Sequence, residues 1–250
     1  MKHKVILWDV YGTLVRAERG DFDSLVKRHA ELLAIFDQTV RNFSLPLSGE
    51  ALHEHFLAAI KSERDRRIAE GAAHPEIRIE EIWLKLLGDA TLNQAREVAL
   101  FFERHANPKQ FRPGAFETLI TLKQRDVRQG IVSNAQFYTP IELSELLREE
   151  SAGAICTYES IFDPALTVFS FELGIAKPDL APFRRAVEAL TRDNIMPDDC
   201  VFVGDSPAND IVPAQHLGFK TVLYAPAGQA KLPVKPDLVI QDLAQLLAWL

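Results

Sequence analysis

A short apolar run near the start of the chain is followed at once by a carboxylate. The run from Val5 to Trp8 is apolar at every position, which predicts a strand buried on both faces of a parallel sheet. Gly12 marks a loop, so Asp9 lies where the strand gives way to that loop. Because ligands of open parallel sheets bind at this edge, Asp9 is a candidate functional residue. A carboxylate that caps the next helix is the alternative at this point.

After this strand the pattern changes to helical spacing for roughly eighty residues. The predicted helices lie, in order, over residues 22–41, 52–70 and 82–87, and from a capping box at 91–94 to about Arg104. Gly71 and Gly88 end the second and third of these helices. No part of this block predicts a strand.

From Pro113 onward, short apolar runs alternate with amphipathic segments. The predicted strands are 130–134, 154–156, 201–204 and 221–224, with helices at about 113–130, 140–150, 178–190 and 205–216, and a last strand and helix from Leu238. This alternation predicts an α/β fold, a doubly wound parallel sheet of Rossmann-like type covered on both faces. The first strand belongs to the same sheet, so we expect a core of residues 1–16 and 107–250 and an inserted α-helical cap of residues 17–106.

Composition narrows the classes of partner. The net charge is -7 with a sequence pI near 5.5, and no basic patch is visible, so a nucleic-acid partner is not expected. Neither a membrane-spanning segment nor a signal peptide is recognisable, so we expect no membrane partner and a soluble, cytoplasmic protein. Arg64, Arg66 and Arg67 alternate with acidic residues, which indicates a solvated helix face; contact with a substrate anion is the alternative.

Polar residues gather where four predicted segments end. They are Asp9 with Thr13, Ser133 with Asn134, Lys177 before Pro178, and Asp205 with Asp210. The carboxyl ends of parallel strands meet at one crevice, so we expect these side chains to converge. Three close carboxylates repel one another unless a cation intervenes, and oxygen ligands suit Mg²⁺. The hydroxyl, amide and ammonium groups are then suited to holding the oxygens of an anionic substrate, and a phosphoryl group is the one we expect.

These motifs, in this order, resemble the haloacid dehalogenase (HAD) superfamily. The resemblance rests on Asp9-Val10-Tyr11-Gly12-Thr13, on Ser133-Asn134, on Lys177-Pro178 and on Gly204-Asp205 through Asp210, and it covers the whole predicted core. The helical insertion after the first motif matches a common position of the cap in that family.

The resemblance implies a role for each matching residue. Asp9 is the expected nucleophile, Thr13 orients it, and Ser133 and Lys177 bind the transferred group. The expected Mg²⁺ ligands are Asp9, Asp205 and the backbone carbonyl of Tyr11, with Asp210 as a further ligand or a partner of the ligands. The expected substrate-binding residues are Tyr11, Gly12, Ser133, Asn134 and Lys177.

Tyr11 departs from the family's phosphatases, which carry a second aspartate there as general acid and base. A tyrosine with a pKa near ~10 is a poor substitute, and it resembles the 2-haloacid dehalogenase branch, which needs no metal. Asp205 and Asp210 favour instead a Mg²⁺-dependent phosphatase that acts on a small phosphorylated metabolite through an aspartyl-phosphate intermediate. A dehalogenase that uses Asp9 without metal, and a non-catalytic phospho-ligand-binding or interaction protein, are the alternatives. Oligomeric state stays open.

Overall fold

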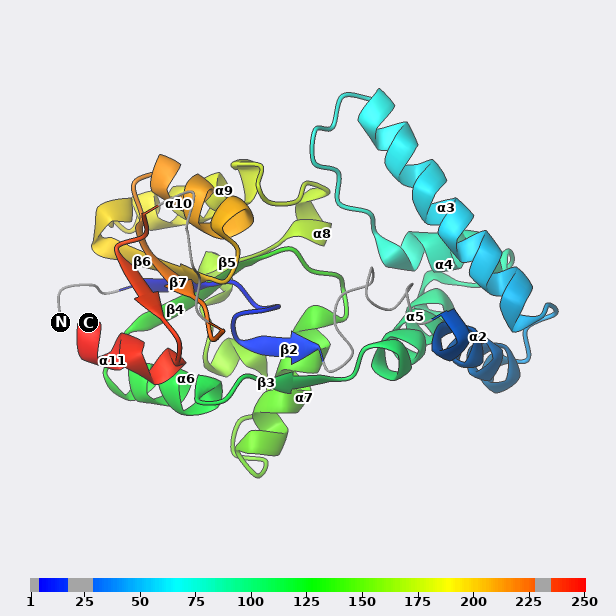
Figure 1. The fold of residues 1–250 in the computed structure, drawn as a ribbon, viewed down its shortest axis with the longest axis horizontal. Helices are drawn as coiled ribbons and strands as arrows, with labels where there is room; N and C mark the ends of the chain where they lie inside the picture. Colours follow the sequence, from blue (N-terminus) through cyan, green and yellow to red (C-terminus); the bar gives the residue numbers. More distant parts are fainter. Residues whose placement is uncertain (1–4, 18–28, 228–234) are drawn as a thin grey trace.

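The computed structural model describes residues 5–17, 29–227 and 235–250 (Figure 1). The strands are β1 (Val5–Trp8), β2 (Val15–Ala17), β3 (Lys109–Phe111), β4 (Arg128–Ser133), β5 (Thr167–Phe169), β6 (Cys200–Gly204), β7 (Lys220–Tyr224) and β8 (Leu238–Ile240). The α-helices are α2 (His29–Phe43), α3 (Gly49–Ala69), α4 (Ile79–Leu87), α5 (Leu92–Ala106), α6 (Ala115–Gln124), α7 (Thr139–Glu150), α8 (Ser170–Leu173), α9 (Ala181–Arg192), α10 (Val212–His216) and α11 (Leu246–Trp249). Single helical turns precede α10 and α11, at Pro207–Ile211 and Leu243–Gln245.

Six strands form one parallel sheet in the order β5-β4-β1-β6-β7-β8. β1 lies at its centre, with Leu7 opposite Gly130 of β4 on one side and Phe202 of β6 on the other. A central strand of a parallel sheet is covered on both faces, and all four residues of β1 are buried. The predicted doubly wound α/β core is confirmed.

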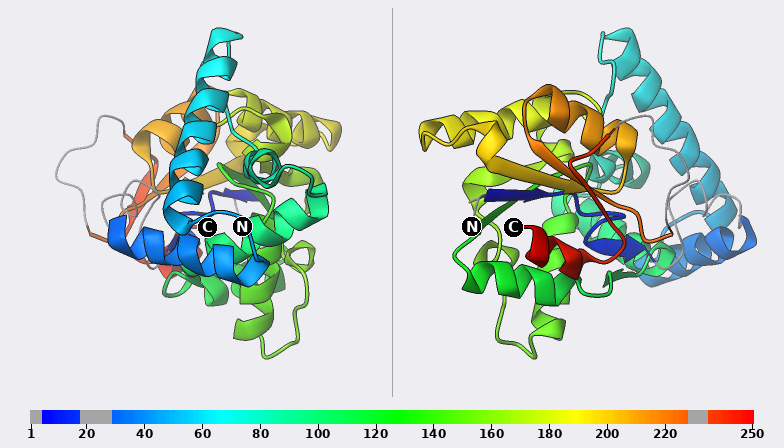
Figure 2. Two further views of the ribbon diagram at one scale, coloured as in Figure 1. Left: turned by 90° about the vertical axis from the view of Figure 1, so that its right-hand side faces the viewer. Right: turned by 60° about the vertical axis from the view of Figure 1, so that its left-hand side comes forward.

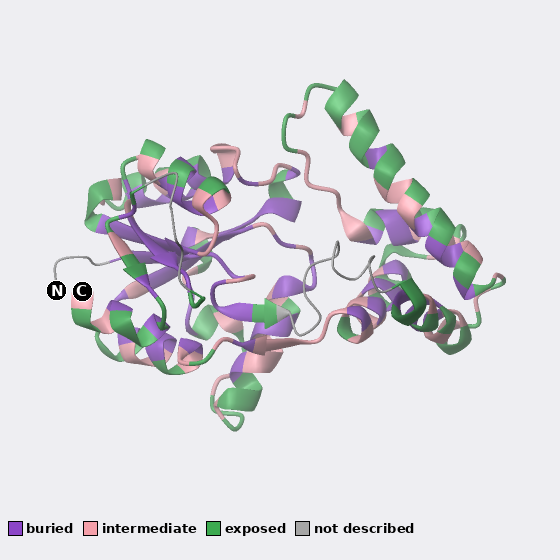
Figure 3. Cartoon of the chain, viewed as in Figure 1, coloured by how far each residue is buried: buried purple, intermediate pink, exposed green. Residues whose placement is uncertain are grey.

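The side chains of β1 alternate between two apolar layers. Val5 and Leu7 pack in the cluster that includes residues of α9 and α10, whereas Ile6 and Trp8 pack in the cluster that includes residues of α6, α7 and α11. The central strands β1, β4, β6 and β7 are almost entirely buried, and the outer helix faces are exposed (Figure 3). Because β1 is packed on both faces, the end of this strand, where Asp9 follows, is held in place.

Helices α2 to α5 form a block beside the sheet, inserted between β2 and β3 (Figures 1 and 2). An aromatic cluster holds the block together: Phe36, Phe56, Trp83 and Phe102 have ring centroids 4.6–6.4 Å apart. The predicted helices over 52–70 and 82–87 are confirmed, as is the capping box at Thr91 and Gln94. The expected helix over 22–41 is seen from His29, and its first part lies outside the described residues. The domain boundaries stay a prediction.

Two predictions about local structure are wrong. Residues 154–156 form no strand, because Ala152 and Gly153 have positive φ and the Ile155 amide donates to Ser151 Oγ, so the chain turns there. The sheet takes β5 instead, at Thr167–Phe169. The helix expected to run to about residue 130 ends at Gln124, and β4 begins at Arg128.

The helical block joins the core at two backbone pairings that the sequence did not reveal. β2 and β3 form a short antiparallel ribbon where the chain leaves and re-enters the core. Residues 74–77, called the strap below, pair with residues 174–176: the Glu76 amide donates to the Gly174 carbonyl (3.1 Å), and the Ala176 amide donates to the His74 carbonyl (2.8 Å). The strap therefore lies against the segment that leads into Lys177. Among the described residues, no helix is long and apolar enough to cross a membrane.

Candidate active site

The loop after β1 presents Asp9 at the carboxyl edge of the sheet. The Asp9 amide donates to the Val203 carbonyl of β6 (2.9 Å), and the Val10 amide donates to Ser133 Oγ at the end of β4 (3.3 Å). Three neighbouring strands thus fix the position of this loop. Asp9 is only 5% exposed, so its carboxylate depends on protein partners.

Those partners are the ones that the sequence predicted. Asp9 Oδ1 accepts hydrogen bonds from Ser133 Oγ (3.0 Å) and Lys177 Nζ (2.7 Å), and Oδ2 accepts from Thr13 Oγ1 (3.2 Å). Lys177 Nζ also pairs with Asp210 Oδ1 (2.6 Å). Side chains from four separate segments of the sequence therefore meet around Asp9 and Lys177.

Asn134 holds Lys177 by its backbone. The Asn134 amide group donates to the Lys177 carbonyl (3.1 Å), and its oxygen accepts from the Lys177 amide (2.7 Å). Both polar ends of the Asn134 side chain are thus engaged by the loop before Pro178. This pairing orients Lys177, whose ammonium group reaches Asp9.

Two glycines let the carboxylates approach so closely. Gly12 has a φ of +93°, and a Cβ there would lie 2.2 Å from the Asp205 carboxylate. A Cβ on Gly204 would lie 2.5 Å from the Asp210 side chain. Any larger residue at either position would displace an acidic side chain.

The three carboxylates form a pocket suited to a divalent cation. Asp9, Asp205 and Asp210 each offer an oxygen, and these oxygens lie within 4.8 Å of one another. Burial, offset in part by Lys177, raises the pKa of Asp9 to about 6; burial and then the charge of Asp9 raise the pKa of Asp205 to about 7. Within the described part of the chain, Lys177 is the one cation that pairs with these three carboxylates, so the ionised set there keeps two uncompensated negative charges. An all-oxygen donor set with this charge fits Mg²⁺.

Lys177 itself stays protonated. Burial opposes its charged form, but the carboxylates of Asp210 and Asp9 outweigh that effect and raise its pKa. A fixed cation beside Asp9 can neutralise oxygens of an anionic substrate without moving a proton.

Tyr11 points its hydroxyl toward α7. The hydroxyl lies 2.8 Å from Thr139 Oγ1 and 3.3 Å from Glu142 Oε2. Burial, and then the charge of Glu142, raise the pKa of Tyr11 well above its usual value. A phenol with so high a pKa is a poor proton donor near neutral pH.

A buried polar cluster surrounds this tyrosine, and no pattern in the sequence predicted it. Lys109 Nζ lies between Glu103 (2.5 Å) and Glu142 (3.0 Å) and over the rings of Tyr11 and Tyr138. Lys109, Glu103 and Glu142 come from β3, α5 and α7, so only the tertiary fold brings them together.

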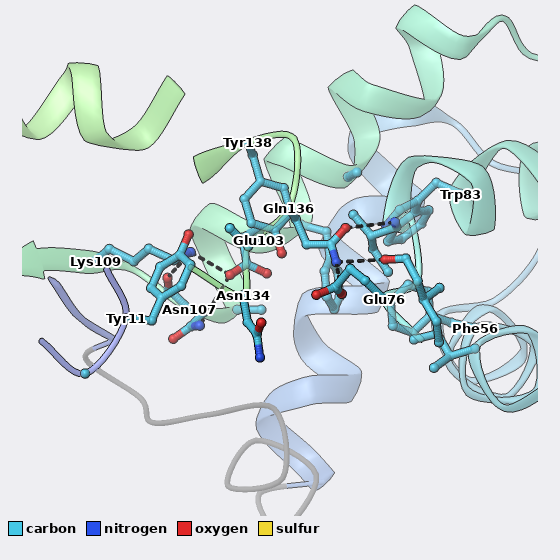
Figure 4. Close-up of a pocket in the computed structure, with 18 of the residues that line it drawn as sticks. Tyr11, Phe56, Glu76, Trp83, Glu103, Asn107, Lys109, Asn134, Gln136 and Tyr138 are labelled. Carbon is cyan, nitrogen blue, oxygen red and sulfur yellow. Dashed lines mark hydrogen bonds and ion pairs between the residues drawn. The ribbon is translucent and has the colours of Figure 1, made fainter. Parts of the chain in front are cut away.

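A cavity of about 890 Å³ opens beside these groups (Figure 4). Gly12, Asn134 and Asp205 line one part of it, and residues of the helical block line another. Its volume is within the ~300–1,000 Å³ typical of small-molecule sites. The carboxylate cluster is therefore accessible from a cavity large enough for an organic substrate.

A buried aspartate held by a serine and a lysine, with further carboxylates on a parallel sheet edge, defines a class of hydrolase. The family model of haloacid dehalogenase-like hydrolases matches residues 3–218. The chain belongs to this family.

Several relatives are phosphatases by name. The chain is 32% identical over 140 residues to the glyceraldehyde 3-phosphate phosphatase of Pyrococcus furiosus, covering 54% of this chain and 52% of that protein. It is 29% identical to the phosphoglycolate phosphatase of Rhodospirillum rubrum, covering 99% of this chain and 90% of that one. The chain thus spans about half the length of the first relative and most of the second.

Solved structures share the fold. A HAD phosphatase from Thermococcus onnurineus matches with a TM-score of 0.59 at 22% identity, and a 2-haloacid dehalogenase from Pseudomonas syringae pv. Tomato DC3000 with 0.61 at 24%. Each match covers 98% of this chain and 97% of the other. Since one is a phosphatase and the other a dehalogenase, the shared fold does not distinguish the two activities.

Proposed function

We propose that the protein is a Mg²⁺-dependent phosphatase that acts on a phosphorylated small molecule. The observation that carries this proposal is the set of Asp205 and Asp210 beside Asp9, where Lys177 is the one cation that pairs with these carboxylates among the residues the structure describes. A 2-haloacid brings a carboxylate of its own, which this cluster would repel. A phosphoryl group together with a divalent cation balances the same charges.

In the proposed reaction, an Asp9 oxygen forms a bond to phosphorus as the bond to the ester oxygen breaks. The ester oxygen leaves with the bonding electrons and takes a proton from water. Ser133 and Lys177 hold the phosphoryl oxygens, and Thr13 keeps the carboxylate oriented. Water then attacks the aspartyl phosphate, releasing inorganic phosphate and restoring Asp9.

The groups proposed to hold the cation are the side chains of Asp9, Asp205 and Asp210 and the backbone carbonyl of Tyr11. When bound, the cation would supply positive charge to the phosphoryl oxygens. The names of the relatives support a phosphorylated substrate for this chain as well. Tyr11 is the observation that favours the second candidate, a dehalogenase, because halide leaves without a proton.

One substrate panel separates the two functions. Phosphate monoesters and 2-haloacids are each assayed with Mg²⁺ and with a chelator, alongside an Asp205→Asn variant. We expect Mg²⁺-dependent phosphate release that Asp205→Asn lowers by at least ~10²-fold, since the variant loses a proposed ligand. Asp199→Asn, in the exposed helical turn just before β6, is the control. Halide release that the chelator leaves unchanged would assign the protein to the dehalogenases.

A further inference from the structure

The strap is docked on the core without the side chain of Glu76. Its backbone pairs with residues 174–176, and Arg67 of α3 donates to the carbonyls of Glu76 (2.8 Å) and Gly174 (3.0 Å). On the strap, these bonds use main-chain groups, so they do not depend on which side chain stands at position 76. The Glu76 side chain is therefore available for a different task.

The carboxylate of Glu76 is held by two side chains of the core. Its Oε1 accepts a hydrogen bond from Gln136 Nε2 (2.7 Å), and its Oε2 accepts one from Ser170 Oγ (2.5 Å). Glu76 and Gln136 both line the cavity, and Figure 4 shows the contact between them. A carboxylate from the helical block is thus directed at the loop that follows β4, in which Gln136 lies.

Ser170 extends this contact to the backbone of the same loop. Its hydroxyl accepts a hydrogen bond from the Ala135 amide (2.8 Å) while it donates to Glu76. Ser170 and Ala135 are 0% and 4% exposed, so water has little access to these bonds. Linked hydrogen bonds in such surroundings strengthen one another. Two hydrogen bonds therefore connect Glu76 to the loop after β4.

This loop carries or holds two residues of the candidate site. Ser133, at its start, donates to Asp9, and Asn134 binds the backbone of Lys177 through both ends of its amide. Ser133 and Lys177 are the groups proposed to hold the phosphoryl oxygens. Hydrogen bonds weaken steeply with distance and angle, so a small shift of the loop would weaken that binding. A contact at Ala135 therefore bears on both groups.

We propose that Glu76 is a positioning residue of the phosphoryl site and acts through Ser170 on the loop after β4. When the helical block is docked, this contact keeps Ser133 and Lys177 at the distances that a phosphoryl group requires. The inference rests on the phosphatase function proposed above and adds to it a residue from outside the sheet edge. Both oxygens of Glu76 are engaged by core side chains, so Glu76 acts through them and not on the phosphate itself.

Inorganic phosphate is the probe for this role, because it can occupy the phosphoryl site without a leaving group that reaches the helical block. Its dissociation constant is measured by calorimetry at saturating Mg²⁺, with circular dichroism as the check on folding. We expect Glu76→Ala to bind phosphate about 10-fold more weakly, the loss of roughly one hydrogen bond to a charged group, and to lower kcat for the best ester by a similar factor. Glu76→Gln keeps one acceptor oxygen for Ser170 and should recover most of the loss.

Glu63→Ala is the matched control. Glu63 is a buried carboxylate of the same helical block, and its partners Arg66 and Lys85 lie within that block. This variant should lose stability and keep its affinity for phosphate. Ser170→Ala tests the route, since Glu76→Ala should weaken phosphate binding far less in that background, where the contact is already broken.

A rise of KM alone in Glu76→Ala, with unchanged phosphate affinity and kcat, would mean that Glu76 only helps to dock the helical block, and would overturn the proposal. Equal weakening of phosphate binding in Glu63→Ala, or full additivity of Glu76→Ala and Ser170→Ala, would overturn it as well. In each of these cases the wild-type protein still releases phosphate, so the phosphatase function stands. If the wild-type protein hydrolyses no phosphate ester of any kind, it is the proposed function that fails, and the inference falls with it.

Discussion

The carboxyl edge of the sheet and the helical block face the same cavity, but their side chains are held in different ways. At the sheet edge, Asp9, Ser133 and Lys177 are buried and bonded to one another. In the helical block, the lining is mainly aromatic and aliphatic and is fixed by packing. Hydrogen bonds demand specific partners at specific distances, whereas packing tolerates many combinations of apolar residues. The chemistry is thus set by one region and the fit of the substrate by the other.

The strap links the two regions directly. Glu76 accepts hydrogen bonds from Gln136 Nε2 (2.7 Å) and Ser170 Oγ (2.5 Å), and Gln136 also donates to the Ile77 carbonyl (2.7 Å). Gln136 lies two residues after Asn134, and the partner of the strap leads into Lys177. A movement of the helical block would therefore be transmitted to residues that surround Asp9.

The largest effect should come from the sheet edge. Asp9→Asn removes the attacking carboxylate while keeping nearly the same shape, so we expect turnover to fall by at least ~10⁴-fold in a folded protein. Steady-state assays on the best ester, with circular dichroism as the check on folding, measure this. Substantial activity in the variant would exclude Asp9 as the nucleophile, for a phosphatase and a dehalogenase alike.

A smaller effect is expected at Tyr11, where the proposed mechanism lacks a general acid. Without a general acid, the ester oxygen leaves as an anion, and the rate depends on how stable that anion is. Aryl phosphates should therefore be cleaved far faster than alkyl phosphates. Tyr11→Asp should narrow the ratio of aryl to alkyl turnover by up to ~10²-fold at saturating Mg²⁺, since it supplies a carboxyl group.

Tyr11→Phe is the control for this prediction. The hydroxyl lies against Thr139 and Glu142, and its pKa is well above the usual value, so its removal should leave the ratio unchanged. A large change of the ratio in Tyr11→Phe would mean that the phenol itself donates the proton. An unchanged ratio in an active Tyr11→Asp protein would show that position 11 is not the acid–base position.

The contrast between the regions also explains what the sequence could predict. Strand β1 and its neighbours are apolar runs followed by polar residues, so the sheet and the meeting of Asp9, Ser133, Lys177 and Asp205 were predictable from local pattern and strand ends. Lys109 pairs with Glu142, which is 33 positions away, and Gln136 pairs with Glu76, which is 60 positions away. No periodicity encodes such contacts, so only the folded structure reveals them.

The local sequence pattern also led to a wrong strand prediction at the edge of the sheet. The apolar triplet at 154–156 is typical of a strand, yet the turn before it and the Ser151 contact place it outside the sheet. β5 was missed because its three residues follow a short helical turn at Pro164–Leu166 with no alternating pattern. Short edge strands owe their pairing to a neighbour, here β4, more than to their own sequence.

Gln136→Ala tests the link between the regions. It removes three hydrogen bonds, including one accepted from the Ile79 amide, and leaves the partly buried Glu76 carboxylate with fewer donors. We expect KM to rise about 10-fold and the free energy of unfolding to fall by about 1–3 kcal/mol. Gln94→Ala, which deletes the same side chain from the capping box of α5, should lower stability without raising KM. A similar rise of KM in both variants would argue against a specific role of the strap.

The smallest expected effect is a pH dependence at the boundary of the two regions. Burial is the main cause that raises the pKa of Glu142 to about 7, although Lys109 opposes it. The folded protein therefore keeps this proton between about pH 4.5 and 7, where the unfolded chain has lost it, so stability falls as pH rises through that window.

Glu142→Gln removes this titration but keeps an oxygen for the Tyr11 hydroxyl, and Lys109 retains Glu103. We expect the loss in free energy of unfolding from pH 5 to pH 8 to be smaller in the variant by about 1–2 kcal/mol. The free energy of unfolding of each protein is measured with urea at saturating Mg²⁺. The titration of Asp9 and Asp205 contributes equally to both proteins and cancels when the two are compared. A steeper loss in the variant would mean that the ionised Glu142 stabilises the fold through Lys109. The polar cluster would then be an ion-pair anchor between β3 and α7, and the burial of its carboxylate would be outweighed by that pairing.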